Sequence, residues 1–346
     1  MITEDAHRGR NSHRHNQAPL LTSRAGRILL TWLCTIVTTL GAYHVPNHLR
    51  MSEKGKDFAF FVWTASLLGC ILMVLANWIS PRNRVTRGEL VSLSLSSLHL
   101  EVVVSAVLRA IQAWSVVFFL TSDKFTASGF PVANAVAFGL VPVMISWFGS
   151  LARSSHYVHS TLYNQITAVL LTCSLLYAAS GQVRTGFYIS DMGIACLAAG
   201  VAASSKVSTS LAVENQSSVT RVVFLRLVAI VVTFPIFMLV LGRSTGVLFW
   251  LKHMWKSAGY LGTLAIALPL SDYFQVQLQL ITFTPVASAV TDAIAWIISF
   301  VLLTFRDRIE LLNSALIGAI LVVPTTVFHW YAVLSDAPPS DSAAVS

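Results

Sequence analysis

The chain has 346 residues, of which 55% are hydrophobic and only 11% are charged. Soluble globular domains contain about 25% charged residues, so this composition excludes an ordinary soluble enzyme and indicates a membrane protein. A net charge of +8 would suggest a nucleic-acid partner in a soluble protein. Here the basic residues lie mostly in joints between apolar stretches, where we expect them to set the orientation of the spans and to contact lipid headgroups. We therefore expect the lipid bilayer, and not nucleic acid, as a partner.

Ten apolar stretches, most of them near the ~20 residues that a spanning helix requires, follow one another along the chain. They are residues 28–44, 57–78, 90–120, 130–151, 162–181, 187–211, 221–241, 257–281, 284–305 and 310–334. This pattern predicts an all-α integral membrane protein with about ten transmembrane helices. Residues 1–25 are expected to form a disordered cytoplasmic head, and residues 335–346 a disordered tail.

The expected orientation follows from the basic residues. An even number of spans places both termini on the same side, and the head contains Arg8, Arg10, Arg14, Arg24 and Arg27. The positive-inside rule then predicts that both termini are cytoplasmic.

Six ionisable residues lie inside the predicted spans, where a charge costs several kcal/mol and is a pointer to function. They are Glu101, Arg109, Lys206, Arg226, Asp272 and Asp292. Glu101 and Arg109 are too far apart on one straight helix to pair, so each is expected to have a partner on another helix. Lys206 either serves function or reaches the interface, whereas Arg226, near the start of its span, is expected to extend to the interface.

The span 257–281 is the most polar of the ten. At 100° per residue, Asp272, Gln275 and Gln279 share one face, while Tyr273 and Gln277 share a second. Such a stripe faces neighbouring helices or a watery pathway, and the number of polar groups favours the pathway. The candidate substrate-binding residues are Lys206, Asp272, Tyr273, Gln275, Gln279 and Asp292.

Other features point away from catalysis. The sequence has no phosphate-binding glycine loop, nucleophile elbow or zinc-protease motif, so we expect no enzyme activity, metal or cofactor. All four cysteines, Cys34, Cys70, Cys173 and Cys196, lie in apolar stretches and are expected to be buried. Small residues over 193–203 permit close helix approach and leave room for a homodimer.

Three stretches resemble a known family. Residues 284–290, Thr-Pro-Val-Ala-Ser-Ala-Val, are similar to a Ser-Pro-Leu-Thr-x-Ser-Val motif, and Phe305-Arg306-Asp307, Asn313 and Gly318 follow as in that family. Residues 193–206 resemble its Gly- and Ala-rich helix that ends in a basic residue, and Pro142 matches a family proline. With ten short-looped spans, the chain resembles the drug/metabolite transporter superfamily, and within it the triose-phosphate translocator and nucleotide-sugar transporter branch.

The resemblance implies two inverted five-helix repeats, residues 26–182 and 183–334, around a central cavity. It also implies that Lys206 contacts an anion and that Asp272 and Tyr273 correspond to a polar pair of the family. Phosphate-carrying members have a lysine where this chain has Ala295. This departure weakens the case for a sugar-phosphate or nucleotide-phosphate substrate.

The resulting hypothesis is a secondary transporter, expected to be an antiporter, that moves nucleotide sugars or a related organic anion across the Golgi or endoplasmic reticulum membrane by alternating access. An unpaired Lys206 in a dry cavity would hinder reorientation of the empty carrier and so enforce exchange. Three alternatives remain: a carrier of uncharged metabolites, a receptor or scaffold, and a membrane-embedded enzyme in which Glu101, Asp272 and Asp292 act as acids on a lipid-like substrate.

Overall fold

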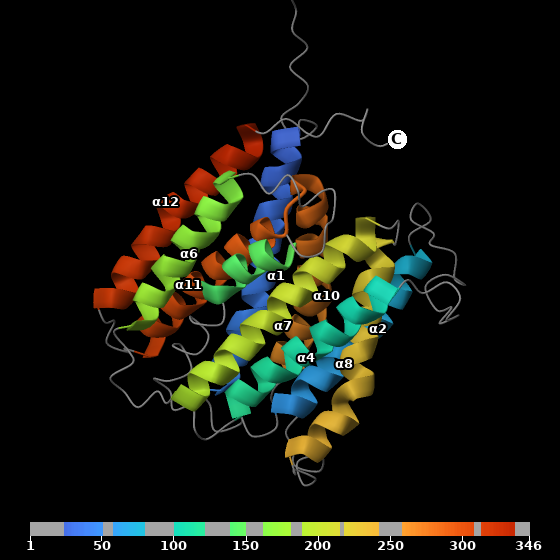
Figure 1. The fold of residues 1–346 in the computed structure, drawn as a ribbon. Helices are drawn as coiled ribbons and strands as arrows, with labels where there is room; N and C mark the ends of the chain where they lie inside the picture. The colour runs from blue at the N-terminus through green and yellow to red at the C-terminus, as the bar shows by residue number, and fades with distance from the viewer. Residues whose placement is uncertain are drawn as a thin grey trace, which may run out of the picture.

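The structure is a computed structural model that describes residues 24–50, 58–79, 100–121, 139–149, 162–180, 189–214, 218–241, 258–307 and 313–335. These residues form helices, with no strand among them, and a helix occupies each of the ten predicted positions (Figure 1). The labelled helices are α1 (Arg24–Arg50), α2 (Phe58–Ile79), α4 (Leu100–Thr121), α6 (Leu162–Ser180), α7 (Ile189–Glu214), α8 (Val219–Leu241), α10 (Ala258–Thr282), α11 (Val286–Asp307) and α12 (Asn313–Ser335). A shorter helix, Gly139–Gly149, lies between α4 and α6 in the chain and is called the 139–149 helix below.

Some predictions lie outside the described residues. They are nearly all of the head and the tail, the first part of the predicted span 90–120, and the start of the predicted span 130–151.

The helices have the character of a multi-pass membrane protein. Six of them, α1, α2, α4, α7, α8 and α12, contain a stretch long and apolar enough to cross a bilayer. Large apolar side chains such as Leu239 (82% exposed) and Ile79 (76%) point outward, whereas Asp272 is only 1% exposed. A surface of this kind suits lipid rather than water. The predicted all-α membrane class is therefore confirmed.

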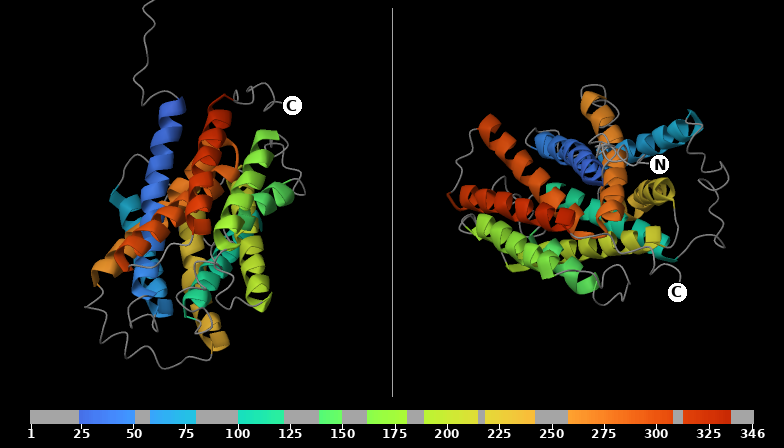
Figure 2. Two further views of the ribbon diagram at one scale, coloured as in Figure 1. Left: turned by 90° about the vertical axis from the view of Figure 1, so that its left-hand side faces the viewer. Right: turned by 90° about the horizontal axis from the view of Figure 1, so that it is seen from above.

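Helix α10 is the centre of the bundle. It contacts α1, α2, α7, α8 and α11, while α4 contacts both α7 and α8. The pair α6 and α12 packs side by side at one edge, as both views in Figure 2 show. A polar helix in this position has helix neighbours on several sides, so its polar groups do not have to face lipid.

The turn between α10 and α11 is built from local signals. Phe283 adopts a left-handed backbone with φ of 54°, a conformation that commonly ends a helix. Thr284 then caps α11, since its hydroxyl oxygen accepts a hydrogen bond from the Val286 amide at 3.3 Å. Pro285 directly precedes Val286, the first residue of α11, and at this end of a helix no amide hydrogen is needed. The short reversal brings the first turns of α11 beside the end of α10.

Apolar clusters hold the helices together. One joins α2, α4, α8 and α10, and includes Trp114 stacked on Phe237 with ring centroids 4.6 Å apart. A second joins the 139–149 helix with α6, α7, α11 and α12. Ala195, Ala199 and Ala203 of the small-residue run are buried in this second cluster, so one face of that run packs within the chain.

The expectation that all four cysteines are buried is wrong. Cys70 is buried, but Cys34 and Cys196 are only partly buried and Cys173 is exposed. An apolar membrane span has a lipid-facing side as well as a buried side, so an apolar sequence context alone does not predict burial.

Gly69 allows the close approach of α2 to α10. A Cβ atom at this position would lie 3.2 Å from the Ala265 carbonyl oxygen, whereas one at Gly262 would have no neighbour within 4 Å. We predict that Gly69→Val lowers the free energy of unfolding by about 1–3 kcal/mol, because backbone must move to admit the side chain. Thermal unfolding in detergent would measure this loss, with Gly262→Val as the matched control. Equal melting temperatures for the two variants would contradict the close packing.

Candidate functional site

Arg109 of α4 and Asp272 of α10 form an ion pair between the two helices. Arg109 Nη2 lies 2.8 Å from Asp272 Oδ1, and Arg109 Nε donates a hydrogen bond to Oδ2 at 3.1 Å. Two parallel contacts of this type fix the orientation of both groups. Arg109 is thus confirmed as having its partner on another helix, whereas Glu101 makes no ion pair with any residue that the structure describes.

A second ion pair joins Lys206 of α7 to Asp292 of α11. Lys206 Nζ lies 2.7 Å from Asp292 Oδ2, and the two side chains are 6% and 4% exposed. The other carboxylate oxygen, Oδ1, accepts a hydrogen bond from Gln275 Nε2 at 2.7 Å. Lys206 Nζ also donates to Ser288 Oγ at 3.1 Å. The hypothesis of an unpaired Lys206 is therefore wrong, because α11 places a carboxylate against it.

Amides and hydroxyls extend this second pair into a network. Gln279 Nε2 donates to Ser288 Oγ at 2.9 Å, and Gln279 Oε1 accepts from Ser210 Oγ of α7 at 2.9 Å. On the other side, Gln275 Nε2 also donates to Thr39 Oγ1 of α1 at 3.4 Å. The polar face of α10 is thereby connected to α1, α7 and α11.

Arg226 of α8 is buried, with only 4% of the residue exposed. Its Nε donates to Ser105 Oγ of α4 at 3.2 Å, and its Nη2 donates to Ser205 Oγ at 3.3 Å and to Thr209 Oγ1, both on α7. Among the described residues, Arg226 forms no ion pair with a carboxylate. The expectation that it extends to the interface is wrong, since α4 and α7 supply hydroxyls at its own depth.

The interior has more positive than negative charge. Arg109, Lys206 and Arg226 contribute three positive charges, while Asp272 and Asp292 contribute two negative charges. One positive charge is thus left over among these five side chains. Contacts bring these groups together. Asp272 and Gln275 of α10 contact Arg109 and Asp292, and Arg226 contacts Ser205 and Thr209, which flank Lys206 in the sequence of α7.

The five charged residues also lie far from the ends of their helices, as expected of a site inside the membrane. Every one of these charged residues is at least six positions from the nearer end of its helix. At a rise of about 1.5 Å per residue, this distance is roughly 9 Å or more along the helix axis.

Five of the six predicted site residues come together in this interior: Lys206, Asp272, Gln275, Gln279 and Asp292. Tyr273 does not join them. It is partly exposed, and its hydroxyl lies 3.4 Å from Gln277 Nε2, its predicted neighbour on the second face of α10. The resemblance paired Tyr273 with Asp272, but adjacent residues on a helix point about 100° apart.

Sequence reasoning missed the hydroxyl partners Ser105, Ser205, Thr209, Ser210 and Ser288. Serine and threonine are common in membrane helices, where they often bond to their own backbone, as Thr209 does to the Ser205 carbonyl. Spacing offers one signal: Lys206 and Ser210 are four residues apart and therefore share a helix face.

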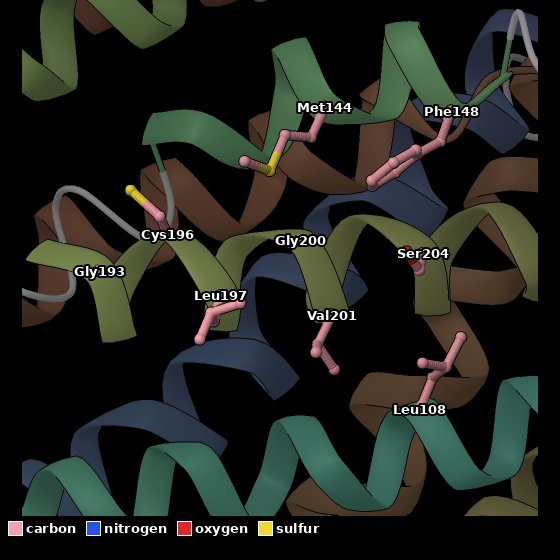
Figure 3. A pocket seen from close by; sticks show the side chains of 9 residues that line it. All are labelled: Leu108, Met144, Phe148, Gly193, Cys196, Leu197, Gly200, Val201 and Ser204. Atoms are coloured by element: carbon pink, nitrogen blue, oxygen red, sulfur yellow. The ribbon is translucent and has the colours of Figure 1, made fainter.

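An apolar groove lies apart from the charged cluster. It has a volume of about 460 Å³ and is bounded by Leu108 of α4, by Met144 and Phe148 of the 139–149 helix, and by one face of α7 (Figure 3). The lining residues of α7 are Gly193, Cys196, Leu197, Gly200, Val201 and Ser204. None of the five clustered charges lines this groove.

Metal binding finds no support in the described ranges. No group of three or more histidine, cysteine, aspartate or glutamate side chains there could hold a metal ion.

No protein-family model and no curated protein matches the chain in sequence. A solved structure, described only as the crystal structure of a protein, matches 90% of this chain and 99% of its own. The TM-score is 0.58 and the sequence identity is 14%. This likeness shows that the fold is one seen in an experimentally solved protein, and it assigns no function.

The Arg109–Asp272 pair yields a stability prediction. Arg109→Met leaves a buried carboxylate without its closest cation and is expected to cost about 3–5 kcal/mol of unfolding free energy. Adding Asp272→Leu removes the remaining charge, so the double variant should recover much of this loss. Thermal unfolding of both single variants and the double variant gives the coupling energy. Additive losses would show that the pair does not interact.

Proposed function

We propose that this protein is a secondary transporter that moves an organic anion across a membrane by alternating access. The observation that supports this most strongly is the interior cluster of three basic and two acidic side chains, four of them buried and Arg109 partly exposed, with one positive charge in excess. Charges inside a membrane are costly, so a protein that keeps five of them at least six residues from the helix ends most often uses them for function. An excess of positive charge favours a negatively charged ligand.

Two inverted repeats, residues 26–182 and 183–334, are part of this proposal. The helix contacts support it, because they correspond in pairs when the two halves are exchanged. Helix α1 packs on α10 as α7 packs on α4, and α2 packs on α10 as α8 packs on α4. Helix α2 contacts α8, and α6 contacts α12. Each of these contacts joins helices that have the same place in the order of their halves, the second helix in one case and the fifth in the other. Transporters built in this way bind substrate where the repeats meet.

The proposed substrate class is a nucleotide sugar or a related organic anion. Lys206 and Arg226 are the basic groups suited to an anionic ligand, and Gln275, Gln279 and Ser288 provide hydrogen bonds for polar groups. The chain has Ala295 where phosphate-carrying members of the family that it resembles have a lysine, and this favours a substrate with less negative charge. A Golgi or endoplasmic reticulum location with cytoplasmic termini belongs to this proposal and rests on the resemblance and the basic head.

The same geometry weighs against the membrane-enzyme alternative. Asp272 and Asp292 pair with different basic side chains, and neither is paired with Glu101. A carboxylate held by a cation is a poor proton donor, so this arrangement is unsuited to general acid catalysis. Transport of an uncharged metabolite remains the second candidate, because the hydrogen-bonding amides could serve it equally well.

Counterflow uptake into proteoliposomes tests the proposal. Vesicles are preloaded with a pool of nucleotide sugars, nucleoside monophosphates and sugar phosphates, and entry of the labelled compounds is measured. We predict preload-dependent uptake by the wild type and at least about a tenfold loss in Lys206→Gln and in Asp272→Asn, since each change removes one partner of an interior ion pair. Ser115→Ala is the control, because this exposed hydroxyl bonds only to its own helix.

Uptake that is lost in both variants but kept in the control supports an anion carrier with its site in the charged cluster. Absence of uptake by correctly folded wild-type protein would contradict an anionic substrate from this pool. Labelled uncharged sugars and nucleosides would then be the next probes.

A further inference from the structure

Asp292 satisfies Lys206 in the way an anionic ligand would. One carboxylate oxygen lies 2.7 Å from Lys206 Nζ, and the other accepts a hydrogen bond from Gln275 Nε2 at 2.7 Å. The residue itself is 3% exposed, so this contact is made inside the protein. A substrate carboxylate or phosphate would present the same oxygen chemistry to the same two donors.

We propose that Asp292 is an internal counter-ion that takes, on Lys206 and Gln275, the place of the substrate's anionic group and so allows the empty carrier to reorient. This inference rests on the proposed transport function and states how that transport is coupled. It replaces the expectation of strict exchange, which required an unpaired Lys206. The carrier is instead able to take up its anion without a returning substrate.

The position of the pair in the fold supports this role. Lys206 is on α7, Gln275 on α10 and Asp292 on α11, and all three belong to the proposed second repeat. A movement of one repeat against the other leaves these three groups together, so this movement does not by itself break the pair in the empty carrier. The Arg109–Asp272 pair joins α4 of the first repeat to α10 of the second, and such movement changes its geometry.

Energetics lead to the same conclusion. A lone lysine taken through a dry interior costs several kcal/mol, whereas a hydrogen-bonded ion pair avoids most of this penalty. When an anion takes the place of Asp292 on Lys206 and Gln275, the Asp292 carboxylate stays within the cluster. The cluster of three cations and two carboxylates then also contains the ligand, so a single negative charge on the ligand makes the whole neutral.

The test compares two modes of uptake in the same proteoliposomes. The probes are labelled UMP, GMP and glucose 6-phosphate, offered either to empty vesicles or to vesicles preloaded with the same unlabelled compound. In the wild type we expect initial rates into empty vesicles to be within about threefold of the counterflow rates, because the empty carrier returns freely. Asp292→Asn should lower entry into empty vesicles at least about tenfold relative to counterflow, because Lys206 then returns unpaired.

Two further variants separate charge from folding. Asp292→Glu keeps the negative charge and should have a higher ratio of empty-vesicle to counterflow uptake than Asp292→Asn. In Lys206→Gln/Asp292→Asn both charges are absent, so amide hydrogen exchange of the empty protein should match that of the wild type. In Asp292→Asn alone, the unpaired Lys206 should hold the empty carrier in one conformation. The amides at one end of α10 and α11 should then exchange more slowly than in the wild type. This second measurement requires no substrate.

The outcomes are distinct. Counterflow without entry into empty wild-type vesicles leaves the transport proposal standing and overturns the counter-ion inference. An unchanged ratio of the two modes in folded Asp292→Asn also overturns it. Absence of both modes in folded wild-type protein contradicts the proposed transport of such anions and overturns this inference with it. The wild-type comparison is decisive even if a variant fails to fold.

Discussion

The cost of burying charge away from water governs this structure. Asp272, Asp292, Lys206 and Arg226 are each at most 5% exposed, and none of them could remain there without polar partners. The helices are therefore arranged so that ion pairs and hydroxyls from five different helices meet around α10. The apolar exterior and the polar interior are two consequences of a protein whose solvent is lipid.

The charged groups differ in which helices they join. Lys206 and Asp292 lie on α7 and α11, within the second half of the chain, while Arg109 and Asp272 connect α4 in the first half to α10 in the second. Arg226 has hydroxyl partners on α4 and α7 and connects three helices at once. One pair thus joins helices of the second half of the chain, whereas the other contacts join helices of both halves. In the proposed transport cycle, only the second kind of contact would change when one half moves against the other.

Local chemistry positions the site as much as long-range packing does. The left-handed Phe283, the Thr284 cap and Pro285 reverse the chain within a few residues, so that Ser288 and Asp292 face Gln279 and Gln275. Close approach at Gly69 brings α2 against the middle of α10. Small side chains on α7 likewise leave room for the 139–149 helix, since a Cβ atom at Gly200 would lie 3.9 Å from Met144 Sδ.

The sequence by itself determined the helices and the polar face of α10, because apolar length and helical spacing are local properties. It indicated the all-α membrane class, the places of the helices along the chain, and the shared face of Asp272, Gln275 and Gln279. Only the tertiary structure decided that Lys206 is paired with Asp292, that Arg226 is buried among hydroxyls, and that Tyr273 lies apart. Each of these outcomes depends on a partner from another helix, and which helices become neighbours is a property of the whole bundle.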